Sequence, residues 1–265
     1  MLDIVLRTCD HTDVHPERGP RFIDVDKTTL IKKCFISLIN SITIAKNLCD
    51  IKLWILDDHS ETSTLDFFSN QCKQREINLE IIALQNKGFN NSAERQFEYC
   101  KNIGCKWVYY VEDDYLHFPS AISNMIIMGE RLEKMTGSYI AIKPDDDPFT
   151  YANNTVSSKK PCRIFLGTDR HWRTLHTTHN TLFTHVSIFE TYWDLFSSLA
   201  KFYKVTTVNE DGTINTIWND GVTKDGPVPL LSPIPSLAIH ISQNNAPYWL
   251  DYNKLWKNIN INGYT

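Results

Sequence analysis

Residues 106–117 read KWVYYVEDDYLH, and this stretch decides the fold of the chain. Residues 107–111 are aromatic or β-branched, which is typical of a strand buried on both faces in a parallel sheet. Three acids, Glu112, Asp113 and Asp114, follow at once. Open α/β sheets bind their ligands beyond the carboxyl ends of the strands, so we expect these acids at a ligand-binding edge.

Three carboxylates this close together raise one another's pKa unless a cation is shared between them. Mg²⁺ and Mn²⁺ prefer hard oxygen ligands, and Mg²⁺ commonly takes one or two carboxylates together with substrate phosphates. The stretch therefore predicts a divalent metal site. The alternative interpretation is a solvated acidic turn.

The composition narrows the class of protein. The 265 residues are 42% hydrophobic and 22% charged, so the chain can bury a substantial core as one large domain or two small ones. A formal charge of -4 and a pI of about 6.1 give no support to a nucleic-acid or polybasic membrane role. No apolar run approaches the roughly 20 residues of a membrane span, and the start of the chain lacks a signal-peptide layout. The seven cysteines include no CxxC pair, and we interpret them as reduced thiols of a cytoplasmic protein.

Strand and helix patterns alternate along the first half of the chain. Apolar runs predict strands at 2–7, 51–56, 79–84, 107–111 and 139–142. Amphipathic helical spacing fills the intervals, so the alternation predicts βαβ units and a mostly parallel sheet. Three of the strands end in acids, which a parallel sheet brings to one edge: Asp10, Asp58 and the pair Asp113 and Asp114.

The pattern breaks after residue 143. Residues 144–171 are polar and predict a long loop over the sheet edge. Four histidines within 171–185 raise the possibility of zinc, but neither an HExxH motif nor a cysteine partner accompanies them. Strands that line a polar pocket are the alternative. Residues 226–235 are Pro-rich and extended, residues 237–241 form a last apolar strand, and the tail from 243 to 265 packs back as a cover.

Glu210 and Asp211 stand before a helical triplet formed by Ile214, Ile217 and Trp218. An acid in this position caps the first turn of a helix and suits its dipole. Capping is compatible with catalysis, because a cap holds the carboxylate in one orientation. Both interpretations stay open on the sequence alone.

These stretches, taken in order, resemble a known family. The first strand ends RTCD and the second LDDHS, an NKG loop precedes AER and then VYYVEDDY, and NED and AIH come later. The set is similar to the GT-A glycosyltransferases, in layout to inverting family 2 enzymes, and the EDD triplet resembles animal N-acetylglucosaminyltransferase I. The resemblance implies a single α/β GT-A (Rossmann-like) domain over 1–265, with helices flanking a mostly parallel sheet. Residues 1–143 would bind the nucleotide-sugar, and residues 144–265 would form the acceptor side and the C-terminal cover.

The resemblance also implies roles for individual residues. Asp114 and His240 would bind Mn²⁺ or Mg²⁺, and Asp211 would be the catalytic base, with Glu210 as the neighbouring alternative. Contacts to the nucleotide-sugar would come from Arg7, Thr8, Asp10, Asp57, Asp58, Arg95, Glu112 and Asp113. From position alone, acceptor contacts are expected at Asp147, Trp172, His179 and Trp249.

The implied activity is the metal-dependent transfer of a hexosyl or N-acetylhexosaminyl group, with inversion, from a nucleoside diphosphate sugar to an acceptor hydroxyl. Uridine is the commonest base in the family, and a glycan, a lipid-linked molecule or a protein are all open as acceptors. AER lacks the asparagine that usually follows the arginine, and without a QxxRW motif a processive synthase is not expected. A non-catalytic nucleotide- or glycan-binding protein of the same fold is one alternative. A sugar-phosphate nucleotidyltransferase is another, although TCDHTD stands where its GxGTRLxP loop belongs, and a Rossmann dehydrogenase lacks its GxGxxG.

Overall fold

The computed structural model describes residues 1–11, 21–148, 151, 161–167, 169–178, 181–202, 209–219, 227–241 and 250–261. Its strands are β1 (Leu2–Thr8), β2 (Ile51–Asp57), β3 (Asn78–Ala83), β4 (Trp107–Glu112), β5 (Tyr115–His117), β6 (Ala141–Ile142), β7 (Ile164–Phe165), β8 (His171–Leu175), β9 (Leu182–His185), β10 (Trp218–Asn219), β11 (Val228–Ile234) and β12 (Ala238–His240). Its helices are α1 (Lys27–Ala45), α2 (Thr62–Gln74), α3 (Phe89–Asn102), α4 (Ala121–Thr136), α6 (Val186–Thr191), α7 (Trp193–Phe202), the 3-10 helix η2 (Ile214–Ile217) and α8 (Tyr252–Asn258).

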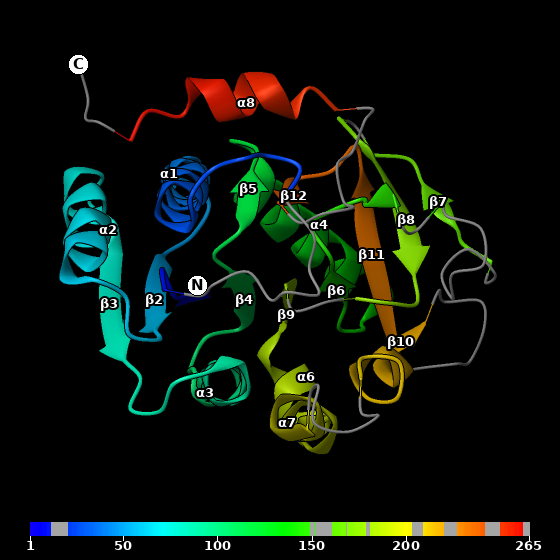
Figure 1. Ribbon diagram of the computed structural model, residues 1–265. Coiled ribbons are helices and arrows are strands. Elements are labelled where there is room, and N and C mark those ends of the chain that lie inside the picture. The colour runs from blue at the N-terminus through cyan, green and yellow to red at the C-terminus, as the bar shows by residue number, and fades with distance from the viewer. Residues whose placement is uncertain are drawn as a thin grey trace.

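Ten strands form one sheet in the order β3-β2-β1-β4-β9-β6-β11-β8-β7, with β10 beside β11, and β12 and β5 form a second, two-stranded sheet (Figure 1). In the first half β1 pairs in parallel with both β2 and β4, so that Thr8 lies opposite Asp57 and Arg7 opposite Glu112. The carboxyl ends of three strands thus meet at one edge. The predicted single α/β domain, with a mostly parallel sheet flanked by helices, is confirmed.

Antiparallel strands interrupt the second half of the sheet. β9 lies between β4 and β6 and is antiparallel to both, and β8 is antiparallel to β11. The Pro-rich stretch that we expected to be merely extended forms β11, where Leu230 and Leu231 are buried. Its prolines did not prevent pairing on both sides, because the ladder uses the N–H groups of the other residues.

Two layers of helices cover the two faces of the sheet. Figure 1 shows α1, α2 and α4 on one side and α3, α6 and α7 on the other, and a separate hydrophobic core lies under each layer. β4 contributes to both cores because its side chains alternate: Tyr109 belongs to the first and Tyr110 to the second. Buried on both faces, β4 is a rigid base for the acids that follow it.

Asp26 caps the amino-terminal end of helix α1. The Asp26 carboxylate accepts a hydrogen bond from the Thr29 backbone N–H at 2.7 Å. Among the described helices, α1 alone is long and apolar enough to span a membrane, with a mean hydropathy of 1.2, and 61% of that apolar window is buried inside the fold. We therefore assign its apolar residues to the core.

The cysteines of the chain are free thiols in the structure. Cys34, Cys72 and Cys100 are buried on helices α1, α2 and α3. Burial raises the pKa of the Cys72 thiol to about 12, so this group stays protonated at neutral pH.

Gly129, in α4, marks a close approach between helix and sheet. A Cβ added there would lie 2.9 Å from a ring carbon of Phe183 and 3.2 Å from one of Trp107, and these two rings are stacked with their centroids 4.9 Å apart. Replacing glycine with alanine inside a helix normally stabilises by about 1 kcal/mol, but overpacking a core costs about 1–3 kcal/mol. We therefore expect Gly129→Ala to lower the free energy of unfolding by about 1 kcal/mol in urea titrations. A more stable variant would show that the rings move aside without cost.

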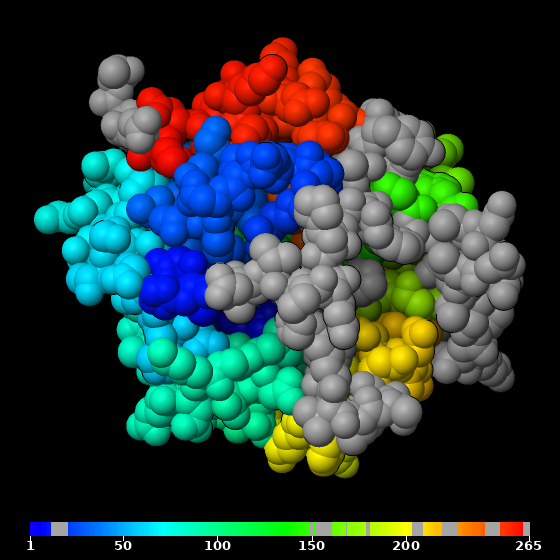
Figure 2. Space-filling model, in the orientation of Figure 1, coloured from blue at the N-terminus to red at the C-terminus, as the bar shows by residue number. Residues whose placement is uncertain are grey.

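The described part of the C-terminal tail packs back on the fold, as predicted. The ring of Tyr252 lies 5.1 Å from that of Phe22, and Lys33 Nζ donates to the Trp256 carbonyl at 2.9 Å. In Figures 1 and 2 α8, in red, lies across the blue surface of α1. Helix α8 therefore covers the outer face of α1.

Candidate active site at the carboxyl edge of the sheet

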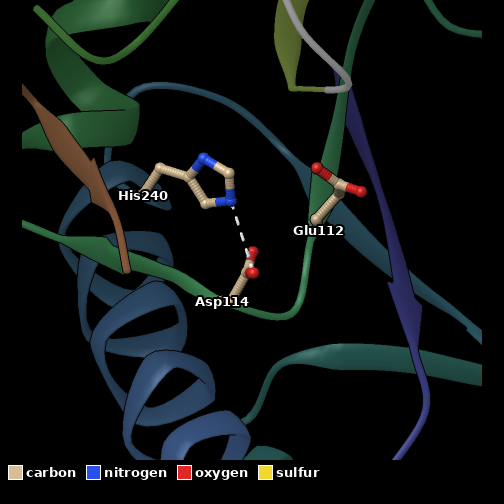
Figure 3. A group of neighbouring side chains, drawn as sticks. All are labelled: Glu112, Asp114 and His240. Atoms are coloured by element: carbon tan, nitrogen blue, oxygen red, sulfur yellow. Dashed lines mark ion pairs between the residues drawn. The ribbon is translucent and has the colours of Figure 1, made fainter. Parts of the chain in front are cut away.

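The acids after β4 lie where β4, β5 and β12 meet. β4 ends at Glu112, and the chain turns through Asp113 and Asp114 into β5. β5 pairs with β12 in antiparallel fashion, with Tyr115 opposite His240. The two rings stack with centroids 4.7 Å apart, and this pairing brings His240 beside Asp114 (Figure 3).

Glu112, Asp114 and His240 form a group of potential metal ligands. One nitrogen or oxygen atom from each lies within 4.8 Å of the others, and His240 Nε2 is 3.3 Å from Asp114 Oδ2. Figure 3 shows Glu112 on β4 beside this pair. Within the described ranges no other group of this kind exists, so the histidines of 171–185 that lie in those ranges form no zinc cluster. The geometry adds Glu112 to the two ligands implied by the resemblance.

Burial and charge together set the protonation of the pair. Burial alone would lower the pKa of His240, but the Asp114 carboxylate raises it to about 9. Burial likewise opposes ionisation of Asp114, yet the charge of His240 and its hydrogen bond hold the pKa of that carboxyl well below its usual range. The two side chains are therefore an ion pair at neutral pH. Asp114 Oδ1 is buried without a hydrogen-bond partner among the described residues, which leaves a carboxylate oxygen suited to a cation.

Cation binding to this group is expected to strengthen as the pH rises. A metal needs the neutral imidazole, so the proton on His240 must leave. Because the pKa of His240 is about 9, the affinity for Mn²⁺ should rise roughly tenfold per pH unit over about pH 6 to 8 in calorimetric titrations. The stability of the metal-free fold should follow the opposite trend, because the raised pKa of His240 stabilises the fold fully below about pH 6.5 and this contribution is lost as the pH rises through about 9. His240→Gln should flatten the pH dependence of affinity, and a flat wild-type profile would contradict the assignment of His240.

Asp113 is not part of the metal-ligand group, and its contacts are with β1 and α1. Its Oδ2 accepts hydrogen bonds from Thr8 Oγ1 at 3.2 Å and from the Cys9 N–H at 2.9 Å, and its Oδ1 lies 2.5 Å from Lys27 Nζ. The middle acid is thus neutralised and fastened to the end of β1, which stabilises the turn that presents the outer two acids. Sequence reasoning missed Lys27, because a lysine in the first turn of a helix carries no signal of its partner.

Arg7 forms an ion pair with Glu112 inside the protein. Its guanidinium also lies 4.4 Å from the centre of the Phe89 ring and 3.3 Å from Ser92 Oγ. The Glu112 N–H donates to Thr181 Oγ1 at 3.3 Å, so both ends of this acid are held. The contacts of Arg7 orient Glu112, and a direct contact from Arg7 to a nucleotide stays a prediction.

Three further acids lie at the ends of β1 and β2, as predicted. The Ser60 N–H donates to Asp57 Oδ1 at 3.1 Å, and Ser60 Oγ accepts from the Asp10 N–H at 3.2 Å. Asp58 Oδ2 accepts from the Gly88 N–H at 2.9 Å. Gly88 has a φ of 104°, which side-chain-bearing residues rarely adopt, so a glycine is needed for this contact. These acids border the edge where the metal-ligand group lies, and their contacts to a nucleotide stay predictions.

Arg95 lies away from these acids. Its side chain is 56% exposed and pairs with Glu98 at 2.5 Å. It lines a cavity of about 460 Å³ together with Met1 and Gly104, at the amino-terminal ends of the strands. Contrary to the prediction, the structure places Arg95 near the opposite edge of the sheet, because the turn of α3 points it there. The next residue, Gln96, points inward and donates to backbone carbonyls of β1 and β4.

The helix after Glu210 and Asp211 is shorter than predicted. Only Ile214–Ile217 is helical, as one 3-10 turn that leads into β10. Asp211 is exposed, and its Oδ1 accepts from Asn215 Nδ2 at 3.0 Å, whereas Asn215 Oδ1 accepts from the Thr178 N–H at 2.8 Å. Asn215 thus orients the Asp211 carboxylate and ties it to the segment that leads into β9, the neighbour of β4.

The positions expected to contact the acceptor have mixed outcomes. Asp147 is 3% exposed and forms an ion pair with Lys143, and Trp172 is 4% exposed within the first core. Contrary to the prediction, neither side chain is presented to solvent. The Asp147 carboxylate is paired with Lys143, and the Trp172 ring is packed in the core. His179 and Trp249 lie outside the described residues.

Comparison with known proteins identifies the family. A family model described as glycosyl transferase family 2 matches residues 27–196, which is 170 of the 265 residues. None of the curated protein sequences matches the chain.

Solved structures share the fold at low sequence identity. The S. aureus TarS 1–349 structure in complex with UDP-GlcNAc has a TM-score of 0.51 and 11% identity, over 96% of this chain and 64% of that one. The mannosyltransferase PcManGT from Pyrobaculum calidifontis, in complex with GDP-Man and Mn²⁺, scores 0.44 at 10% identity, over 72% of this chain and 46% of its own. An apo UDP-glucose pyrophosphorylase scores 0.46 at 11% identity, over 91% and 93% of the two chains.

These likenesses concern the fold alone. The chain spans less than two thirds of the TarS chains that it matches, between 35% and 64% of their length.

Proposed function

Because the chain belongs to glycosyl transferase family 2, we propose that it moves a sugar from a nucleoside diphosphate donor to an acceptor hydroxyl with the help of a divalent cation. The observation that carries the proposal is the convergence of Glu112, Asp114 and His240 within 4.8 Å at the carboxyl edge of the sheet. A UDP-linked hexose or N-acetylhexosamine is the proposed donor. The TarS structure of similar fold holds UDP-GlcNAc, which supports that choice.

Mn²⁺ or Mg²⁺ would be held by the two outer acids of the EDD triplet and by His240. The donor set fits such a cation, since it offers two carboxylates and a buried carboxylate oxygen without a partner. When bound, the cation neutralises the charge that develops on the diphosphate leaving group. Asp113 would act indirectly, by holding the turn through Lys27. We propose that these roles of the three EDD acids underlie the resemblance of the triplet to that of N-acetylglucosaminyltransferase I.

Asp211 is the proposed catalytic base. It would accept the proton of the acceptor hydroxyl while that oxygen attacks the anomeric carbon from the side opposite the diphosphate, which inverts the configuration. The exposed carboxylate and its hydrogen bond from Asn215 support this role. We assign donor binding to residues 1–143 and the acceptor side to residues 144–265.

Calorimetric titration of UDP, UDP-GlcNAc and UDP-glucose with and without Mn²⁺, followed by an assay of donor hydrolysis, tests the function. We expect binding that requires the cation and slow release of free sugar. Binding without any hydrolysis or transfer would favour a non-catalytic binding protein. Formation of UTP from UDP-glucose and pyrophosphate would instead identify a nucleotidyltransferase.

A further inference from the structure

A second group of charged side chains lies at the carboxyl end of β6. Four of the five residues in 143–147 are charged, and each of the four is at most 3% exposed. The backbone fixes this segment beside the strand that carries His240: the Pro144 carbonyl accepts hydrogen bonds from the Leu237 and Ala238 N–H groups at 2.8 and 3.1 Å. Ser232 Oγ donates to the Asp145 carbonyl at 3.0 Å. The segment is therefore hydrogen-bonded both to β11 and to the start of β12.

Two of its three acids have defined partners. Asp146 lies 2.5 Å from the Arg173 guanidinium and accepts a hydrogen bond from Tyr151 Oη at 2.8 Å. Asp147 forms an ion pair with Lys143. Both carboxylates thus have charge-assisted contacts that account for their burial.

Asp145 differs from its two neighbours. It is 3% exposed, and neither of its carboxylate oxygens accepts a hydrogen bond from another described side chain or backbone group. The nearest described cation is Lys143, whose Nζ lies 3.4 Å from Oδ2 and is already paired with Asp147. Burial raises the pKa of Asp145, and the charge of Lys143 offsets this only in part, so a ligand that donates a hydrogen bond to this carboxyl group would stabilise it inside the fold.

Asp145 lies on the same edge as the metal-ligand group. In the sheet order only β9 separates β4 from β6, so these two parallel strands run about 10 Å apart, which is two strand spacings, and Ile142 at the end of β6 is level with Tyr109. Asp145 also acts electrostatically on that group: the pKa of His240, which burial lowers and Asp114 raises, is raised further by the charge of Asp145. A sugar attached to a diphosphate at Asp114 would extend along this edge toward β6.

We propose that Asp145 accepts a hydrogen bond from a hydroxyl group of the transferred sugar and thereby contributes to the choice of donor. This inference rests on the proposed function and assigns the sugar end of the same site. A sugar hydroxyl supplies the missing donor without adding charge. A second cation is the poorer candidate, because no group of metal ligands in the described chain includes Asp145.

The test removes the proposed hydrogen bond in two ways: by omitting the sugar hydroxyl and by replacing the Asp145 carboxylate. Affinities of UDP-GlcNAc and UDP-glucose, and of their analogues that lack one sugar hydroxyl each, are measured with Mn²⁺ for the wild type and for Asp145→Asn. A site whose buried carboxyl group pairs with a sugar hydroxyl rejects the analogue that lacks this hydroxyl. We expect the wild type to discriminate against one analogue by roughly 10- to 100-fold, and Asp145→Asn to lose that discrimination while its affinity for UDP is retained.

Asp146→Asn is the matched control, since it changes an equally buried acid in the same segment whose partners are Arg173 and Tyr151. It should lower the thermal stability and leave the discrimination ratio as in the wild type. The ratio is measured within each variant, so a general loss of stability does not imitate the expected effect.

Equal discrimination in the wild type and in Asp145→Asn would overturn the assignment of Asp145 while the proposed function stands. If Asp145→Asn fails to fold, the wild type still provides a test. The assignment of Asp145 is also overturned if the wild type binds every deoxy analogue within about threefold of the parent sugar nucleotide. Failure of the wild type to bind UDP and both sugar nucleotides would instead remove the proposed function, and this assignment with it.

Discussion

Replacing Asp114 with asparagine is expected to abolish cation binding and to lower sugar transfer by roughly 10³-fold or more, while the fold survives. Asn keeps the volume of Asp but removes the charge that faces His240 and the unpartnered oxygen suited to a metal. Charge neutralisation at a diphosphate leaving group supplies several kcal/mol, which sets the size of the loss. Calorimetric titration with Mn²⁺ and an assay with the donor would measure both effects.

Asp113→Asn is the control for this result, because it changes the neighbouring acid of the same triplet. Asp113 is held by Lys27 and by the end of β1, not by the metal-ligand group. Its replacement should weaken the affinity for Mn²⁺ by roughly 10- to 100-fold without abolishing cation binding. If Asp113→Asn abolished cation binding while Asp114→Asn did not, the assignment of the outer acids as ligands would be wrong.

Replacing Asp211 with asparagine should lower transfer by roughly 10²- to 10⁴-fold, the usual contribution of a general base. Binding of UDP and Mn²⁺ should stay within about threefold of the wild type, since the exposed Asp211 is no member of the metal-ligand group. Initial rates and calorimetric affinities separate the two effects.

Glu210→Gln is the matched control, because Glu210 adjoins Asp211 and was the alternative base on the sequence. It should keep the wild-type rate within about threefold. A rate for Asp211→Asn near that of the wild type would exclude Asp211 as the base. The configuration of the product anomer would then have to be determined, because retention would call for a different mechanism.

The sequence predicted the first half of the fold well because its signals there are local. An apolar run such as 107–111, flanked by helical periodicity, is enough to predict a strand buried between two layers. The acids at the strand ends were placed correctly for the same reason: strands β1, β2 and β4 are parallel, so their ends meet. The family motifs led us to expect Asp114 and His240 at one site, and the structure brings the two side chains together.

The parts that the sequence did not predict depend on contacts between distant segments. Arg95 and Gln96 are adjacent in α3, and only the helical phase against β1 and β4 decides that Gln96 faces the sheet. Lys27 pairs with Asp113 across a separation of 86 residues, and no local pattern encodes that pairing. The burial of Asp147 likewise depends on its contact with Lys143, whose backbone N–H donates to the Leu231 carbonyl of β11.

A crystal of the protein soaked with MnCl₂ and UDP, with anomalous data collected at the manganese edge, tests the central claim most directly. We predict one strong anomalous peak within coordination distance of Asp114 and His240, with Glu112 beside it and the diphosphate completing the shell. An anomalous peak elsewhere, or UDP bound at this edge with the Asp114–His240 ion pair intact, would contradict it.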